Sequence, residues 1–236
     1  MICFLTSRHD LDGTDHLRLN PSNQFVDRLR QHFPTPCRAI YVCSDPDGWD
    51  TMDRYSACVR AAFENEGFRF ERFLTLDSRN EAHAAELVRS TNLLILAGGH
   101  VPTQNRFFRK IGLRELLSDF DGVLIGISAG SMNCAEVVYA HPDLEGEAVD
   151  PNYQKDLPGL GLTRTRILPH YQEIKDDVLD GLRVMEDVAY PDSKERPICV
   201  LPDGSYVYIE GGKETVMGEA YLLSGGTLTP YPKECC

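Results

Sequence analysis

The sequence predicts an α/β protein: a mostly parallel β-sheet with helices on both faces, followed by a C-terminal β-hairpin or meander. Three observations lead to this fold class. Apolar runs alternate with helical patterns along most of the chain. Several of these runs are almost continuously apolar, which is typical of strands buried on both faces. From residue 197 onward the pattern changes to short strands separated by Gly-rich turns.

Six apolar runs predict the strands of the sheet. Each run is followed by a helical pattern, and this βαβ order implies parallel strands joined by helices that cover the sheet. The predicted strands span residues 2–7, 38–44, 68–76, 92–99, 122–128 and 164–171.

Amphipathic patterns predict the helices between these strands. The helix that begins at residue 50 ends at Gly67, because glycine readily adopts the left-handed conformation that stops a helix. The predicted helices span residues 23–33, 50–67, 80–90, 104–120, 129–138 and 173–188. Residues 139–161 form the longest irregular stretch, and a long loop of this kind is a candidate to cover a functional site.

Composition restricts the function classes. The chain has 236 residues, 42% of them hydrophobic, and no linker interrupts it, which predicts one domain over residues 1–236. A formal charge of −12 argues against nucleic acid or an anionic membrane as a partner. No apolar run reaches the roughly 18 residues needed to span a bilayer. The start, MICFLTSRHD, lacks the features of a signal peptide and is predicted to be the first strand.

The eight cysteines contain no Cys-x-x-Cys pair and form no metal-like cluster with histidine. Several of them lie in apolar strands, where cysteine usually acts as a small hydrophobe. We therefore expect a reduced, cytoplasmic setting and no metal site.

The segment Gly126-Ile127-Ser128-Ala129-Gly130 joins an apolar strand to a helical pattern. This G-x-S-x-G arrangement is typical of a nucleophile elbow, in which glycines relieve crowding around a strained serine. Sites of open α/β sheets form beyond the carboxyl ends of the strands, where Ser128 is expected. The alternative is an ordinary tight turn.

A nucleophilic serine needs a neighbouring base, usually histidine. His170 ends the run RTRILPHY, and His100 follows Gly98-Gly99 at the end of another strand. Both histidines are therefore expected at the same sheet edge as Ser128. His141, in the irregular segment, is a weaker competitor.

The backbone amides of Gly99 and Ala129 are candidates for an oxyanion hole. The alternative is that Gly98-Gly99 forms a tight turn that uses glycine for its conformation alone.

The acid that orients the histidine has several candidates after Ser128. Asp203 follows the apolar run in CVLPDGS, but Pro-Asp-Gly is also an ordinary turn sequence. The residues alone do not decide among the acids, which are Glu136, Asp143, Glu145, Glu147, Asp150 and Asp203.

Together, five segments resemble the peptidase family that includes aspartyl dipeptidase (peptidase E) and cyanophycinase, which shares the fold of class I glutamine amidotransferases. The segments occur in the family's order and span about residues 1 to 230. They are GWDTMDRY, LILAGGHVPTQ, GISAGS, ILPHY and VLPDGS.

The resemblance implies a serine peptidase that hydrolyses small peptides through an acyl-enzyme and needs no cofactor. It makes Ser128 the nucleophile, His170 the base and Asp203 the third member of the triad, at a position where the family usually has glutamate. Asp143 is the reserve candidate for the acid. His100 stands where the family loop usually has asparagine, which implies a substrate-binding position.

Aspartyl dipeptidases carry an arginine-bearing insert after the histidine, which is implicated in holding an acidic substrate side chain. This chain continues instead with HYQEIKDDVLDGLRVMED, in which Arg183 is the only arginine. The resemblance therefore does not imply strict Asp-X specificity.

Two alternatives remain beside the peptidase. An α/β-hydrolase esterase also uses G-x-S-x-G, but its triad runs Ser, acid, His, whereas His170 here precedes Asp203. A glutamine amidotransferase would need cysteine at position 128, so that activity is not expected. A non-catalytic binding or regulatory protein of the same fold is the alternative from another class, and a serine-directed probe distinguishes it from an enzyme.

Overall fold

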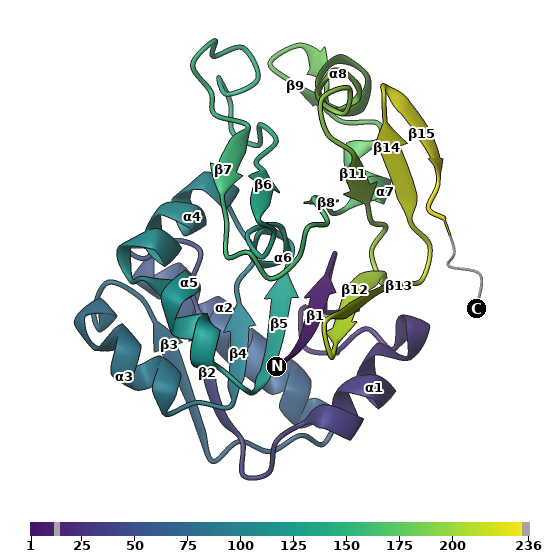
Figure 1. Ribbon diagram of the computed structural model, residues 1–236. Helices are drawn as coiled ribbons and strands as arrows, with labels where there is room; N and C mark the ends of the chain where they lie inside the picture. Colours follow the sequence, from purple (N-terminus) through teal and green to yellow (C-terminus); the bar gives the residue numbers. More distant parts are fainter. Residues whose placement is uncertain (12–14, 233–236) are drawn as a thin grey trace.

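The computed structural model describes residues 1–11 and 15–232 and contains a seven-stranded sheet at its centre (Figure 1). Strands β1, β5, β4, β2 and β3 run parallel, while β12 and β13 extend the sheet antiparallel beyond β1. The predicted mostly parallel sheet is thus confirmed. Its strands are β1 (Ile2–Thr6), β2 (Arg38–Val42), β3 (Arg72–Leu76), β4 (Leu93–Leu96), β5 (Val123–Ile127), β12 (Tyr206–Glu210) and β13 (Lys213–Met217).

Helices cover both faces of this sheet because successive strand residues point to opposite sides. Phe4 of β1 packs in one core with Phe25 and Phe63, which belong to α1 (Phe25–His32) and α2 (Trp49–Asn65). The next residue, Leu5, packs in the opposite core with Phe107 of α4 and with side chains of α3 and α5. These helices are α3 (Ala84–Arg89), α4 (Val101–Lys110) and α5 (Leu113–Leu116); the 3₁₀ turns are η1 (Ser22–Gln24), η2 (Glu81–His83) and η3 (Leu117–Asp119).

A second sheet has four strands in the order β15-β14-β11-β8. Its strands β8 and β11 run parallel, so their carboxyl ends lie at one edge. The C-terminal strands form the hairpins β12–β13 and β14–β15, as predicted. The bounds are β8 (Ile167–Leu168), β11 (Ile198–Val200), β14 (Tyr221–Ser224) and β15 (Thr227–Pro230).

The helix predicted over residues 129–138 is wrong in length. Helix α6 (Ala129–Met132) is a single turn, and the chain then enters β6 (Val137–Tyr139), which pairs antiparallel with β7 (Asp156–Pro158). Two valines and a tyrosine favour a strand at β6.

The strand predicted over residues 164–171 is shorter in the structure. Pro169 follows β8 directly and cannot donate a ladder hydrogen bond, so the strand ends at Leu168.

The helix predicted over residues 173–188 is wrong for most of its length. Helix α7 (Tyr171–Ile174) is followed by the hairpin of β9 (Val178–Leu179) and β10 (Leu182–Arg183), a π-helical turn η4 (Val184–Ala189) and α8 (Tyr190–Asp192). Asp180 and Gly181 have φ values of 55° and 81° and connect β9 to β10. Asp-Gly is a strong signal for such a two-residue hairpin turn, and here it overrides the helical periodicity.

Six of the eight cysteines are free thiols, namely Cys3, Cys37, Cys43, Cys58, Cys134 and Cys199. Burial raises the pKa of Cys3 and Cys199 to about 12, so these thiols are neutral and pack as small apolar groups. Cys235 and Cys236 lie outside the described residues. No helix in residues 1–11 and 15–232 is both long and apolar enough to cross a membrane.

Candidate active site

Ser128 follows β5 directly and has a strained backbone, with φ 48° and ψ −110°. A residue other than glycine keeps such a conformation only where its surroundings impose it. The Ser128 amide donates to the Thr6 carbonyl (3.0 Å), and the Ser128 carbonyl accepts from the amides of Ser131 and Met132. A Cβ atom at Gly130 would overlap the Leu96 backbone, so the close approach of this turn to β4 requires glycine. The local geometry is that of a strained strand–turn–helix elbow.

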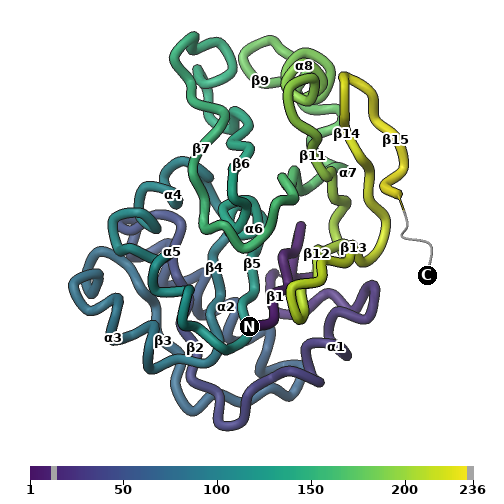
Figure 2. Tube along the Cα trace, in the orientation of Figure 1, coloured from purple at the N-terminus to yellow at the C-terminus, as the bar shows by residue number. Residues whose placement is uncertain are grey.

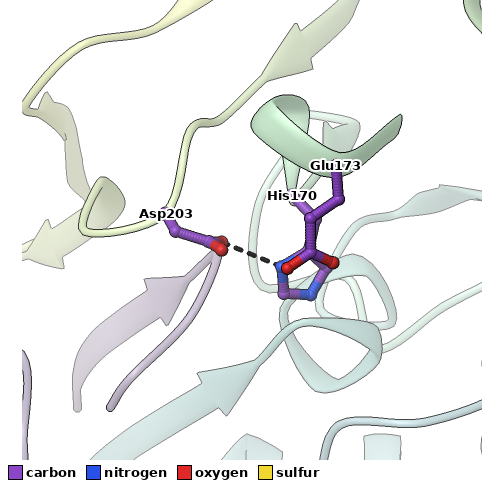
Figure 3. A group of neighbouring side chains, drawn as sticks. All are labelled: His170, Glu173 and Asp203. Atoms are coloured by element: carbon purple, nitrogen blue, oxygen red, sulfur yellow. Dashed lines mark hydrogen bonds and ion pairs between the residues drawn. The ribbon is translucent and has the colours of Figure 1, made fainter. Parts of the chain in front are cut away.

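His170 and Asp203 lie at the carboxyl edge of the second sheet. In the parallel pair β8–β11, Leu168 is opposite Val200, and the two functional residues follow shortly after these strands end. His170 Nε2 is 2.9 Å from Ser128 Oγ, and His170 Nδ1 is 2.8 Å from Asp203 Oδ1 (Figure 3 shows the latter pair). The structure therefore brings together the three residues that the sequence singles out as nucleophile, base and acid.

The charge of Asp203 decides the direction of these hydrogen bonds. Burial raises the pKa of Asp203, but hydrogen bonds from His170 and Ser7 and favourable electrostatic interactions with His170 and Arg8 outweigh burial, so the pKa lies below its ordinary value. The ionised carboxylate accepts the Nδ1–H of His170. The Nε2 lone pair then faces Ser128, whose hydroxyl donates to it.

Ser7 is a site residue that the sequence analysis missed. Its hydroxyl donates to Asp203 Oδ1 (2.7 Å) and accepts from the His170 backbone amide (2.8 Å). Ser7 follows β1 and is fully buried. It lies 163 residues before His170 in the chain, so no local pattern signals the contact.

The loop after β4 lies beside the elbow. A Cβ atom placed on Gly98 would lie 3.5 Å from Ser128 Cβ, which puts Gly98, the residue before Gly99, in contact range of Ser128. Within the described part of the chain, the amides of Gly99 and Ala129 donate no hydrogen bond to a protein acceptor. Both amides are free to bind a ligand oxygen.

His100 is held by the long loop between β6 and β7. Its Nε2 is 2.9 Å from Glu147 Oε1, and its Nδ1 is 2.8 Å from Thr103 Oγ1, so both ring nitrogens already have protein partners. Burial raises the pKa of Glu147, but two backbone amides and His100 outweigh it, so the pKa lies below its usual value and the carboxylate is ionised. The sequence analysis considered Glu147 only as a candidate acid for the triad, because no local pattern signals its contact with His100.

The same loop is also fixed to the hairpin β9–β10. The amides of Gly146 and Ala148 donate to the two carboxylate oxygens of Asp180 (2.8 and 3.0 Å). Figure 2 shows the loop and the hairpin side by side at one end of the molecule. Asp143 belongs to this loop: its amide donates to Glu147 Oε2, and its carboxylate makes no contact with His170 in the described structure.

One group of three side chains in residues 1–11 and 15–232 has ligand atoms close enough to share a metal ion: His170, Glu173 and Asp203, all within 4.8 Å of one another (Figure 3). Two of the three are already engaged, because His170 Nδ1 donates to Asp203 and His170 Nε2 faces Ser128. A metal ion on His170 would displace one of these bonds. Glu173 is mostly exposed and lies 3.5 Å from Arg8 Nη1.

Chelation is therefore expected to leave the activity unchanged. EDTA treatment followed by dialysis should give the same turnover as the untreated protein, because the arrangement of Ser128, His170 and Asp203 is complete without a metal. The measurement is the rate of substrate hydrolysis before and after treatment. Loss of activity in EDTA that zinc restores would show that the group around His170 holds a functional metal.

Comparison with known proteins identifies the family. Residues 37–217, well over half of the chain, match peptidase family S51. The chain belongs to peptidase family S51. A Drosophila melanogaster protein named "Probable alpha-aspartyl dipeptidase" is 26% identical over 189 residues, which cover 74% of this chain and 73% of that protein. The predicted membership in the peptidase E family is thus confirmed, and the chain is a serine-type peptidase.

The crystal structure of a candidate peptidase E from Listeria monocytogenes EGD-e has the same fold as this S51 peptidase. The TM-score is 0.62 at 14% identity, and the alignment covers 91% of this chain and 96% of the other. At this level of identity the likeness supports the architecture, including the large mostly parallel sheet.

Arg183, the arginine nearest after His170, is already paired in this S51 peptidase. Its Nε and Nη2 each donate to a carboxylate oxygen of Asp187 (3.0 and 2.9 Å). The side chain lies on β10 and is mostly exposed. The guanidinium group of Arg183 is therefore engaged by Asp187.

Proposed function

We propose that this S51 peptidase hydrolyses peptide bonds of small peptides with Ser128 as nucleophile, His170 as general base and Asp203 as the orienting acid. The observation that carries the proposal is His170, whose two ring nitrogens reach Ser128 Oγ and Asp203 Oδ1 at 2.9 and 2.8 Å. The side chain of His170 is 25% exposed, which leaves it accessible to a substrate.

In the proposed reaction, Ser128 Oγ attacks the scissile carbonyl carbon while its proton passes to His170 Nε2. The negative charge that forms on the carbonyl oxygen is stabilised by the amides of Gly99 and Ala129. The C–N bond then breaks, and the leaving amine takes the proton from His170, which leaves an acyl-enzyme on Ser128. Water, deprotonated by His170, hydrolyses the ester and releases Ser128. Asp203 holds the imidazole and stabilises its positive charge, and no cofactor takes part.

The preference for small peptides is supported by the relative's name, which is that of a dipeptidase. The β6–β7 loop is hydrogen-bonded to His100 and, through Asp180, to the β9–β10 hairpin, so the loop is fixed beside His100. His100 is proposed to line the substrate site through its ring face, since its nitrogens are occupied.

We also propose that residues 1–236 act as one domain and that the protein works in the cytoplasm. One hydrophobic core contains Cys3 and Val207 of the large sheet together with Ile167 and Cys199 of the small sheet, which supports a single unit. The six free cysteines support a reducing compartment.

A hydrolysis screen tests this function. The purified protein is incubated with dipeptides of acidic, neutral and basic first residue, with aminoacyl esters, and with peptides of about ten residues. We expect cleavage of dipeptides or esters, with longer peptides cleaved at least tenfold more slowly. Equal cleavage of long peptides would contradict the small-peptide assignment, and no cleavage of any ester or peptide would contradict the function itself.

Activity is expected to fall on acidification, because a protonated His170 cannot accept the Ser128 proton. We therefore expect kcat/KM to decline as the pH is lowered from 8 towards 5. Asp203 does not limit activity in this range, because its pKa is depressed. A flat kcat/KM profile from pH 5 to 8 would argue against a histidine base.

The depressed pKa of Asp203 also affects stability. The stability that ionised Asp203 contributes is present above its unfolded pKa of roughly 3.9 and is lost as the pH falls through its lower folded pKa.

A further inference from the structure

Ser7 connects the proposed base to the proposed acid through a single hydroxyl group. We propose that Ser7 is a positioning residue of the peptidase reaction, which fixes His170 and Asp203 relative to each other. This inference rests on the proposed function of that pair. Ser7 does not contact Ser128 Oγ, so its effect on the reaction passes through the histidine and the aspartate.

The hydroxyl uses its one donor position and one of its two acceptor positions. A serine hydroxyl can donate once and accept twice. The Ser7 hydroxyl lies 2.7 Å from Asp203 Oδ1 and 3.2 Å from the Leu201 carbonyl oxygen, and the shorter contact to a charged oxygen is the stronger one. It accepts from the His170 amide at 2.8 Å. Because Ser7 is fully buried, no water can replace these bonds without rearrangement.

Each bond restrains one member of the base–acid pair. His170 has a left-handed backbone, with φ 59° and ψ 38°. The hydrogen bond from its backbone amide to the Ser7 hydroxyl holds this backbone in place and so positions the imidazole ring. Asp203 Oδ1 accepts from both Ser7 and His170 Nδ1, so two donors fix the carboxylate.

Ser7 itself is placed by the central sheet. It follows β1, the strand that lies between β5 and β12, and its amide donates to the Ser205 carbonyl (3.1 Å). At the same end of β1, the Thr6 carbonyl accepts a hydrogen bond from the Ser128 amide (3.0 Å). The end of β1 is therefore bonded to all three members of the proposed triad, through Thr6 to the serine and through Ser7 to the other two.

Removing the hydroxyl is expected to lower kcat more than it changes substrate binding. Ser7→Ala leaves the His170 amide without its acceptor and Asp203 with one donor fewer. A misplacement of about 1 Å can cost roughly 100-fold in rate, so we expect kcat to fall ten- to a hundredfold. KM should stay within twofold, because Ser7 is buried and does not touch the substrate.

The experiment compares three substitutions at Ser7 with a matched control. Ser7→Thr retains the hydroxyl and should restore kcat to within threefold of the wild type, whereas Ser7→Cys, nearly isosteric but a weak hydrogen-bonding group, should show the alanine defect. Ser205→Ala removes a second buried serine hydroxyl, from a residue whose hydroxyl is not bonded to the triad, and should leave kcat within twofold. Thermal melts identify the folded variants; if Ser7→Ala does not fold, Ser7→Cys and Ser7→Thr carry the comparison.

Wild-type kcat in Ser7→Ala or Ser7→Cys would overturn the proposal, and so would an equal loss in Ser205→Ala. Failure of the proposed function looks different: the wild type itself would then show no turnover that depends on Ser128. If only this inference fails, turnover still depends on Ser128 while Ser7 is dispensable.

Discussion

Replacing Ser128 by alanine is expected to abolish peptide hydrolysis and to leave the fold intact. The substitution removes the hydroxyl that lies 2.9 Å from His170 Nε2 and little packing, because the elbow is held by backbone bonds and by glycine contacts. Loss of one triad member lowers turnover by about 10⁴- to 10⁶-fold in serine hydrolases. The measurement is kcat on any cleaved substrate, with circular dichroism as the test of folding.

Ser131→Ala is the matched control for this experiment. Ser131 lies one turn further along, is fully buried and donates to the Thr6 carbonyl (2.8 Å) instead of facing His170. Loss of this hydrogen bond should reduce the free energy of unfolding by about 1 kcal/mol. Turnover should stay within a few fold of the wild-type value. Retention of more than a tenth of wild-type turnover by Ser128→Ala would rule out the mechanism.

Asp203→Asn is expected to lower turnover by roughly 10⁴-fold with the fold preserved. The amide has nearly the shape of the carboxylate but carries no charge, and its NH₂ group cannot accept the Nδ1–H of His170. The imidazole then favours the tautomer with its proton on Nε2, which cannot take the proton of Ser128. The measurement is kcat together with a pH profile of kcat/KM.

Asp143→Asn is the control that decides between the two candidate acids. Asp143 lies in the β6–β7 loop, where its amide is bonded to Glu147. We expect at most a severalfold change, mainly in KM, because the loop stands beside the substrate site. A greater loss of turnover in Asp143→Asn than in Asp203→Asn would show that the acid has been misassigned.

The sheet and the candidates Ser128 and His170 were predictable from local patterns, whereas Asp203 was chosen among the acids through the family resemblance. Apolar runs define the strands, and the carboxyl ends of parallel strands meet at one edge. The expectation that His170 shares a sheet edge with Ser128 is wrong, because Ser128 follows β5 of the large sheet whereas His170 follows β8 of the small sheet. Asp203 reaches His170 at 2.8 Å although its side chain is one methylene shorter than the glutamate usual in the resembling family. The base and the acid both follow strands of the small sheet, β8 and β11, which pair in parallel.

Ser7 and Glu147 could not be predicted because their roles depend on contacts that only the folded chain creates. Ser7 is 163 residues from His170, and Glu147 is 47 residues from His100. The false helix over residues 173–188 has a different cause. Its apolar spacing suits a helix, but the turn at Asp180 and Gly181 forms a hairpin whose aspartate then bonds to the β6–β7 loop. Local turn chemistry and a tertiary contact together outweigh periodicity there.

The central claim is that Ser128 is the nucleophile, and covalent labelling tests it most directly. The protein is treated with a fluorophosphonate probe, digested and mapped by mass spectrometry, with and without a cleaved substrate as competitor. We predict a single adduct on the peptide that contains Ser128, slower labelling in the presence of substrate, and no adduct in Ser128→Ala. An adduct on another residue, or hydrolysis that continues in fully labelled protein, would contradict the assignment.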